Sequence, residues 1–218
     1  MSIKQNLNEI KSQLPNQVTL VAVSKTKPVS DLMEAYNAGQ RIFGENKIQE
    51  MADKYEEMPK DIEWHMIGHV QRNKVKYMAE FVSLIHGVDS LKLLNEIDKQ
   101  AQKHERIIDC LIQIKIAEED SKFGISAKDV EELLISEAFK NLKNIRVTGL
   151  MGMATFTDDN NQVEQEFKPD LVHIQHFQFL SSGLRFQAPV AMTLHDHWGW
   201  CAAGGTLMRP NGALCAGP

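Results

Sequence analysis

The chain has 218 residues, of which 43% are hydrophobic and 24% charged, and its formal net charge is −5 at pH 7. This composition is that of an ordinary globular protein, and the length suits one large domain or two small ones. The negative charge argues against a nucleic-acid or membrane-surface partner, and no run approaches the roughly 18 apolar residues of a membrane span. Three cysteines and a polar N-terminus without an apolar signal core indicate a cytoplasmic protein.

Short apolar runs alternate with helical patterns from the N-terminus to about residue 156. The apolar runs predict six buried strands, at 17–25, 41–46, 62–70, 82–90, 106–116 and 145–156. The charged stretches between them predict helices, at 29–39, 47–58, 71–81, 91–105 and 126–139. Ser30 is placed to cap the first of these helices and Gly39 to end it. This order of strands and helices predicts a parallel α/β fold with right-handed crossovers.

Polar residues gather where the predicted strands end, which is where parallel α/β folds build their sites. Lys25 and Lys27 follow the first strand within "VAVSKTKP", residues 21–28. A lysine just inside an apolar rim is partly desolvated and therefore a better nucleophile, as a Schiff base with an aldehyde or ketone requires. From spacing alone, however, a solvated loop lysine is the simpler interpretation of Lys25, and even more so of Lys27.

Five motifs in order closely resemble those of the pyridoxal phosphate homeostasis family. They are "VAVSKTKP", "AGQRIFGENKIQE", "WHMIGHVQRNK", "GVDS" and "KFGI" with "GLMGMATF". The resemblance covers about residues 5–167 and implies a (β/α)8 TIM-type barrel of the alanine racemase N-terminal kind. It also implies that pyridoxal 5′-phosphate is the cofactor, bound to Lys25 as the first lysine of "SKTKP". Asn46 would lie beside the cofactor ring and Met151 would pack near it; a strand-end cap and a core methionine are the alternatives.

The same resemblance implies a protein that binds the cofactor reversibly and limits its free concentration, without being an enzyme. Racemases related to this barrel take a second base, a tyrosine, from an additional β domain. The 3 tyrosines of this chain all fall in predicted helices, so we expect no racemase activity, and we expect a monomer whose partner is the small-molecule cofactor. His65 and His69 lack a third ligand for a metal. We expect His65 to pack in the barrel and His69 to lie at its rim.

After residue 168 this family's pattern is no longer recognisable. Family members continue with a "SMGMS"-type strand end and a glycine-containing turn, and these hold the cofactor phosphate at a helix N-terminus. Residues 169–218 instead resemble part of the N-terminal domain of family-4 GT-B glycosyltransferases, through "PDLVHIQH" and "APVAMTLHDHW". The sequence therefore predicts a pyridoxal-phosphate-binding barrel over 1–168, with strands 1 to 6, and a foreign segment over 169–218 in place of the last two β/α units.

Two strand-like runs in the foreign segment, 171–177 and 189–195, bring the count to eight, so they could complete the barrel. Gly204, Gly205 and Thr206 faintly resemble the missing phosphate turn, but the glycosyltransferase resemblance accounts better for the residues around them. We therefore expect weakened cofactor binding. The alternative functions are a fragment of a GT-B glycosyltransferase and a fusion without function.

Overall fold

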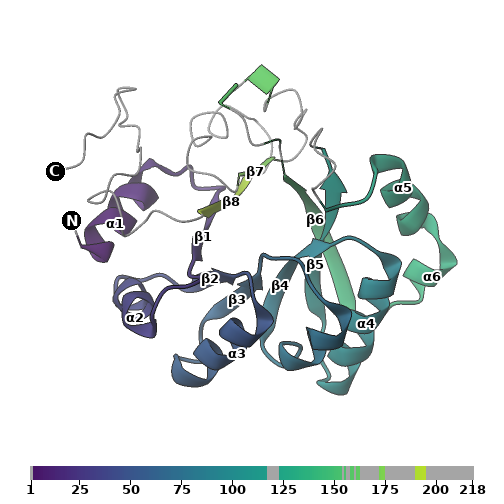
Figure 1. Ribbon diagram of the computed structural model, residues 1–218, viewed down its shortest axis with the longest axis horizontal. Helices are drawn as coiled ribbons and strands as arrows, with labels where there is room; N and C mark the ends of the chain where they lie inside the picture. The colour runs from purple at the N-terminus through teal and green to yellow at the C-terminus, as the bar shows by residue number, and fades with distance from the viewer. Residues whose placement is uncertain are drawn as a thin grey trace.

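The computed structural model describes residues 2–116, 123–153, 155, 158–159, 161–162, 172–174 and 190–194. The strands are β1 Thr19–Val23, β2 Ile42–Glu45, β3 Glu63–Met66, β4 Val82–Val88, β5 Ile108–Lys115, β6 Ile145–Met153, β7 Val172–Ile174 and β8 Val190–Leu194. The helices are α1 Ile3–Gln13, α2 Val29–Asn37, α3 Ile48–Glu57, α4 Leu91–Lys103, α5 Ala127–Ile135 and α6 Glu137–Lys140, and a 3-10 helix η1 spans Arg72–Tyr77. The strands surround a common interior and the helices lie outside them (Figure 1).

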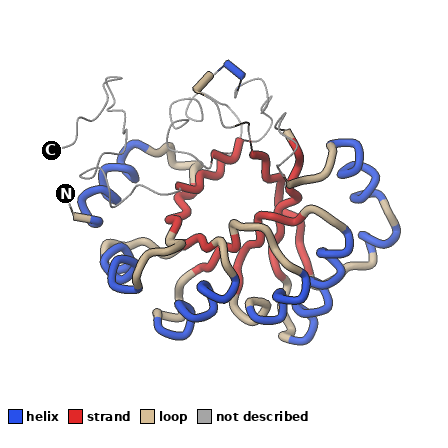
Figure 2. The backbone as a smooth tube through the Cα atoms, in the orientation of Figure 1, coloured by secondary structure: helices blue, strands red, loops and turns tan. Residues whose placement is uncertain are grey.

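All strand pairs are parallel, and the order across the sheet is β6-β5-β4-β3-β2-β1-β8-β7. This is the cyclic order of an eight-stranded barrel, in which the last strand pairs with the first. β6 and β7 stand at the two ends of this order and approach one another (Figure 2). The predicted parallel α/β fold is therefore confirmed: β1–β6 form a half-barrel of TIM type, which β8 and β7 extend. The predicted boundary at residue 168 lies outside the described residues.

The structure differs from two sequence-based expectations about helices. The helix predicted at 71–81 is present only as the 3-10 helix η1, with i→i−3 bonds such as Lys74 N–H to the Gln71 carbonyl oxygen. Ser30 does not cap α2; the N-cap is Pro28, whose φ of −70° already suits the start of a helix. The predicted end of this helix is confirmed, since Gly39 has a φ of +93° just beyond it.

The two sides of the sheet have different surroundings. Alternate residues of the strands belong to the apolar core between the sheet and the helices, and Trp64 and Met66 of β3 are among them. The residues between them face the interior of the ring of strands, because side chains alternate along a strand. Val21, Val23 and His65 are buried there, so His65 packs within the barrel as expected. No helix in the described part of the chain has the length and apolar character needed to cross a membrane.

Candidate functional site

Lys25 lies in a tight turn at the carboxyl end of β1. Ser24, just before it, is fully buried, and its N–H donates to the carbonyl oxygen of Gly44 on β2 at 2.9 Å. The N–H of Lys27 donates back to the carbonyl oxygen of Ser24 at 3.1 Å and closes the turn. Lys25 itself is half-buried. The structure therefore places Lys25 at the rim of the barrel, at the edge where parallel α/β folds build their sites.

Thr26, directly after Lys25, has a backbone conformation that its residue type disfavours. Its φ is +61°, in the left-handed region, where a β-branched residue is an outlier. Such a conformation costs about 1–3 kcal/mol and persists only where the surroundings fix it. Here the Thr26 N–H donates to Oε1 of Glu50 on α3 at 2.5 Å. The turn that carries Lys25 is therefore held by a helix that lies outside it in sequence.

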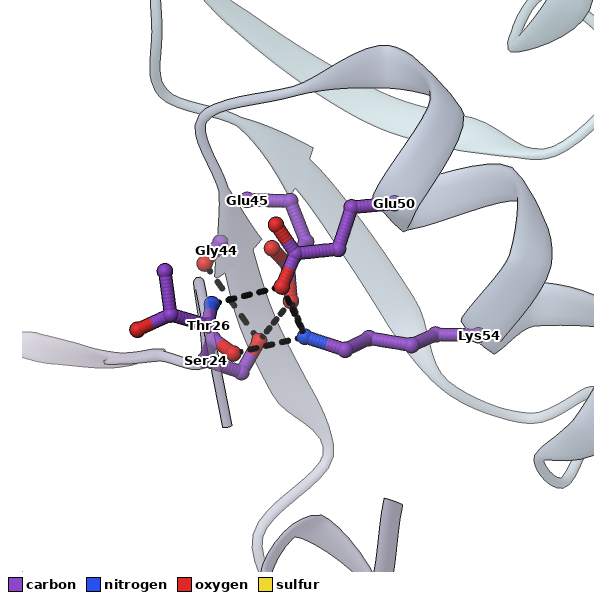
Figure 3. Close-up of polar contacts among 6 residues, drawn as sticks. All are labelled: Ser24, Thr26, Gly44, Glu45, Glu50 and Lys54. Atoms are coloured by element: carbon purple, nitrogen blue, oxygen red, sulfur yellow. Dashed lines mark hydrogen bonds and ion pairs between the residues drawn. The ribbon is translucent and has the colours of Figure 1, made fainter. Parts of the chain in front are cut away.

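A charged cluster made of Glu45, Glu50 and Lys54, here called the Lys54 cluster, lies against this turn (Figure 3). The Lys54 ammonium group donates to Oε1 of Glu45 and to Oε1 of Glu50, each at 2.7 Å. It also donates to the carbonyl oxygen of Ser24 at 2.7 Å. Oε1 of Glu45 accepts from the Ser24 hydroxyl at 2.6 Å. The carbonyl and hydroxyl groups of Ser24 and the N–H of Thr26 are thus connected, directly or through one carboxylate, to Lys54.

Burial strengthens the attraction between the Lys54 ammonium group and the carboxylates of Glu45 and Glu50. Glu45 is fully buried and the Lys54 side chain is 7% exposed, whereas Glu50 is 24% exposed. Burial raises the pKa of Glu45, while the hydrogen bonds from Lys54 and Ser24 oppose that rise. A buried lysine is retained when its ammonium group is paired, and here it has three acceptors for its three N–H donors.

Asn46 follows β2 and stands at the next strand end along the sheet. Its side-chain Oδ1 is buried and accepts no hydrogen bond from the described part of the chain. Gly68 lies against its backbone so closely that a Cβ at residue 68 would come within 2.4 Å of the Asn46 carbonyl oxygen. Only glycine fits there. The rim beside β1 therefore carries a buried acceptor that a bound ligand could use.

Met151 is fully buried on β6 and aligns with Gln113 of β5. Gln113 is also buried, and its Nε2 donates to the carbonyl oxygen of Phe123 at 3.1 Å. Lys25 and Asn46 therefore follow the neighbouring strands β1 and β2, whereas Met151 lies on β6, at one end of the strand order. The role of Met151 beside a cofactor stays a prediction.

The two histidines that the sequence singled out have different environments. His65 is buried, with its Nδ1 3.1 Å from Nε2 of the buried His86, and burial lowers the pKa of His65 to about 4. His69 stacks on the Phe123 ring, with centroids 4.3 Å apart, and its Nδ1 lies 3.7 Å from a carboxylate oxygen of Asp89. Among the residues with described positions, no group of three or more His, Cys, Asp or Glu could hold a metal ion.

Residues 1–195 match the family model described as the alanine racemase N-terminal domain. A Vibrio alginolyticus protein named pyridoxal phosphate homeostasis protein is 34% identical over 233 aligned residues, which cover 98% of this chain and 96% of that protein. The chain belongs to the family of pyridoxal phosphate homeostasis proteins. A Pasteurella multocida protein of the same name is 37% identical over 77% of this chain and 76% of its own length.

Solved structures of a similar protein have the same fold as this chain. PipY of Synechococcus elongatus PCC7942, solved without PLP, has a TM-score of 0.76 and 27% identity over 88% of this chain and 98% of PipY. PipY was also solved with PLP bound, and that structure has a TM-score of 0.74 and 26% identity over the same shares. Family membership is thus supported by both sequence and fold.

The described residues fit pyridoxal phosphate at one end of the site. A half-buried lysine in a fixed turn and a buried acceptor on Asn46 stand at adjacent strand ends. Gly204, Gly205 and Thr206, which faintly resemble the missing phosphate turn, lie outside the described residues. Sequence reasoning missed the Lys54 cluster, for which the available signal was the i, i+4 spacing of Glu50 and Lys54.

Proposed function

We propose that this chain binds pyridoxal 5′-phosphate reversibly through Lys25 and thereby limits the concentration of the free aldehyde. The observation that carries this proposal is the position of Lys25, half-buried in a turn whose flanking residues are tied to the Lys54 cluster. The shared family and the PLP-bound PipY relative support the choice of ligand. Lys25 would hold the cofactor, which would supply an aldehyde for a reversible condensation with the Lys25 amine, with release and uptake of one water molecule.

Lys25 has to present an uncharged amine to an aldehyde, and Asn46 and Met151 would define the space beside it. The Oδ1 of Asn46 can accept a hydrogen bond from a bound ring substituent, and Met151 offers an apolar, adaptable surface. Titration with pyridoxal phosphate tests the proposal. We expect a saturable visible absorbance band beyond that of the free cofactor, which borohydride removes, and a titration that shows only the absorbance of the free cofactor would contradict the proposal.

We propose further that the chain does not turn over amino acids. The three tyrosines lie on α2, α3 and η1 rather than at strand ends: the Tyr36 hydroxyl donates to Asp61, Tyr55 stacks on Phe81, and Tyr77 is 52% exposed. No tyrosine is therefore placed as the second base that the related racemases use. Incubation of the cofactor-loaded protein with L-alanine should give no D-alanine above a cofactor-only control, and racemase-like turnover would overturn this part of the proposal.

We also propose that the segment 169–218 is a replacement for the family's own last two β/α units and that it weakens the hold on the phosphate. Its support is the loss of the family motifs after residue 168. The family model nevertheless extends to residue 195 and the Vibrio relative covers 98% of the chain, so the alignments do not mark a boundary at 168. The phosphate carries about two negative charges and needs several N–H donors, so missing donors would lower affinity strongly.

A comparison of two chains tests this part. The present chain and a version whose residues after 168 come from an intact relative are titrated with pyridoxal phosphate and with plain pyridoxal. We expect the present chain to bind the phosphorylated form at least about a hundredfold more weakly, because charge-assisted hydrogen bonds contribute about 1.5–3 kcal/mol each. Equal affinity and selectivity would mean that Gly204, Gly205 and Thr206 rebuild the phosphate site. Binding by the repaired chain alone would favour a fusion without function.

A further inference from the structure

We propose that Lys54 is a positioning residue for Lys25: its ammonium group holds Glu45 and Glu50 where they fix the turn that carries Lys25. The inference rests on the proposed role of Lys25 and adds the residue that orients it. Lys54 lies on α3, 29 positions away in the sequence, and is drawn beside the turn in Figure 3.

The contacts of Lys54 reach both sides of Lys25. On the N-terminal side, Lys54 donates to the Ser24 carbonyl oxygen at 2.7 Å, and Glu45 accepts from the Ser24 hydroxyl at 2.6 Å. On the C-terminal side, Glu50 accepts from the Thr26 N–H at 2.5 Å. Both carboxylates also accept from the Lys54 ammonium group. A single ammonium group therefore organises the chain immediately before and immediately after Lys25.

The charge of Lys54 is needed because two carboxylates meet at this place. Glu45 and Glu50 both accept from Lys54 through Oε1, and the charge of Glu50 disfavours ionised Glu45. Without the ammonium group, the carboxylates would have to separate or take up a proton. Either change weakens the acceptor for the Thr26 N–H. Loss of Lys54 should therefore weaken the hydrogen bond of the Thr26 N–H to Glu50, although no hydrogen bond joins Lys54 to Thr26 directly.

The left-handed conformation of Thr26 makes the turn dependent on this support. A threonine with a φ of +61° relaxes to an extended or helical conformation when nothing holds it. Relaxation would rotate the adjacent peptide units and move Lys25 relative to Lys27, two residues further on. The reactive aldehyde would then meet both amines, so the preference for Lys25 over Lys27 should fall. A purely structural role of Lys54 would lower the folded fraction but leave this preference unchanged.

Two pairs of variants isolate the contact. Lys54→Met removes the ammonium group, and Lys92→Met, an exposed lysine of α4, is the matched control. Glu50→Leu removes the acceptor of the Thr26 N–H, whereas Glu50→Gln keeps an oxygen at that position. The Glu50 pair keeps the idea testable if Lys54→Met does not fold, because Glu50 is partly exposed and its loss leaves Lys54 paired with Glu45.

Two measurements are made on each folded variant. The first is hydrogen exchange at the Thr26 amide in cofactor-free protein, which should be about tenfold faster or more in Lys54→Met and Glu50→Leu, with a smaller change in Glu50→Gln and none in Lys92→Met. The second is the ratio of Lys25 to Lys27 modified by pyridoxal phosphate and borohydride, quantified by peptide mass spectrometry. That ratio should fall about tenfold or more in the first two variants and stay near wild type in the control.

The outcomes separate this inference from the function on which it rests. If wild-type protein is not modified at Lys25, the proposed function fails, and Thr26 exchange still reports whether Lys54 fixes the turn. If wild-type protein is modified at Lys25 but both measurements are unchanged in folded Lys54→Met, the positioning role is wrong and the proposed function stands. Faster exchange without a change in the Lys25 to Lys27 ratio would also overturn the positioning role.

Discussion

The Lys54 cluster, formed by α3 and the end of β2, and the His65–His86 pair, on β3 and β4, are both buried polar groups, but burial has opposite consequences for their charge. Lys54 brings a charge among two carboxylates and a backbone carbonyl, so its ammonium group has an acceptor for each donor. His65 has the buried His86 as its neighbour, and burial lowers the pKa of His65 to about 4, so the ring is neutral near pH 7. A buried group stays ionised where an opposite charge and hydrogen bonds compensate for its lost hydration.

The positions of the two clusters in the barrel differ as well. The Lys54 cluster contacts the turn that carries Lys25, whereas His65 lies on β3 and faces the interior. Substitutions in the Lys54 cluster should therefore change the reaction of Lys25 with a ligand. Substitutions of His65 should change the free energy of unfolding and its pH dependence. The following substitutions test that division, beginning with the largest expected effect.

Lys25→Ala should abolish the saturable absorbance change on titration with pyridoxal phosphate, because no amine remains at that position of the turn. Lys27→Ala should retain the change, since Lys25 is still held between Ser24 and Thr26. Parallel titrations of the two variants measure this difference. A Lys25→Ala protein that binds like wild type would contradict the assignment of the amine.

Lys54→Met should lower the free energy of unfolding by about 3–5 kcal/mol, because removal of one partner leaves buried carboxylate charge without compensation. The control Lys92→Met, at an exposed position of α4, should change it little. Urea unfolding at pH 7 measures both. A loss in Lys54→Met no larger than in the control would mean that the Lys54 cluster is not charged as its contacts indicate.

His65 should make the folded state less stable as the pH falls from about 6.5 toward 4. Its pKa is about 4 in the folded chain and 6.5 when unperturbed, so the unfolded chain binds the extra proton in this window. The stability that neutral His65 contributes is fully present above pH 6.5, and about 3 kcal/mol of it is lost near pH 4. His65→Gln should flatten the dependence of unfolding free energy on pH in this window, whereas the exposed His104→Gln should not. An equal slope in wild type and His65→Gln would contradict the buried, neutral ring.

Gly68→Ala should destabilise the chain by about 1–3 kcal/mol, since its Cβ would lie 2.4 Å from the Asn46 carbonyl oxygen and backbone must move. The matched change Gly44→Ala should cost less, because its Cβ would meet the side-chain atoms of Ile67 and Val21 at 3.1 Å, and side chains can shift. Thermal unfolding compares the two. A smaller loss for Gly68→Ala than for Gly44→Ala would show that the rim at Asn46 is looser than the contacts indicate.

The strands could be predicted from sequence because their signals are local, and Lys25 could be placed at a strand end, although its role as the reactive amine came from the family resemblance. Apolar runs mark β1–β6, and the motif around Lys25 stands directly after β1. The i, i+4 spacing of Glu50 and Lys54 was a local signal of the Lys54 cluster, but the burial of Lys54 could not be predicted, because charged residues in "KIQEMADKYEEM" have the pattern of a solvated helix face. Lys54 is buried because α3 packs against β2 and β3, which brings its ammonium group to Glu45 and to the Ser24 carbonyl oxygen. The Ser30 cap was wrong for a related reason: a local preference yielded to the backbone conformation that Pro28 sets.

The assignment of Lys25 as the cofactor-binding lysine is tested most directly by finding which lysine of the wild-type chain the cofactor modifies. The protein is incubated with pyridoxal phosphate, reduced with borohydride and digested, and every modified lysine is located by mass spectrometry. We predict that the modification lies on Lys25, because the Lys54 cluster fixes that residue in the half-buried turn at the end of β1. Modification spread over exposed lysines, with no preference for Lys25, would contradict the account.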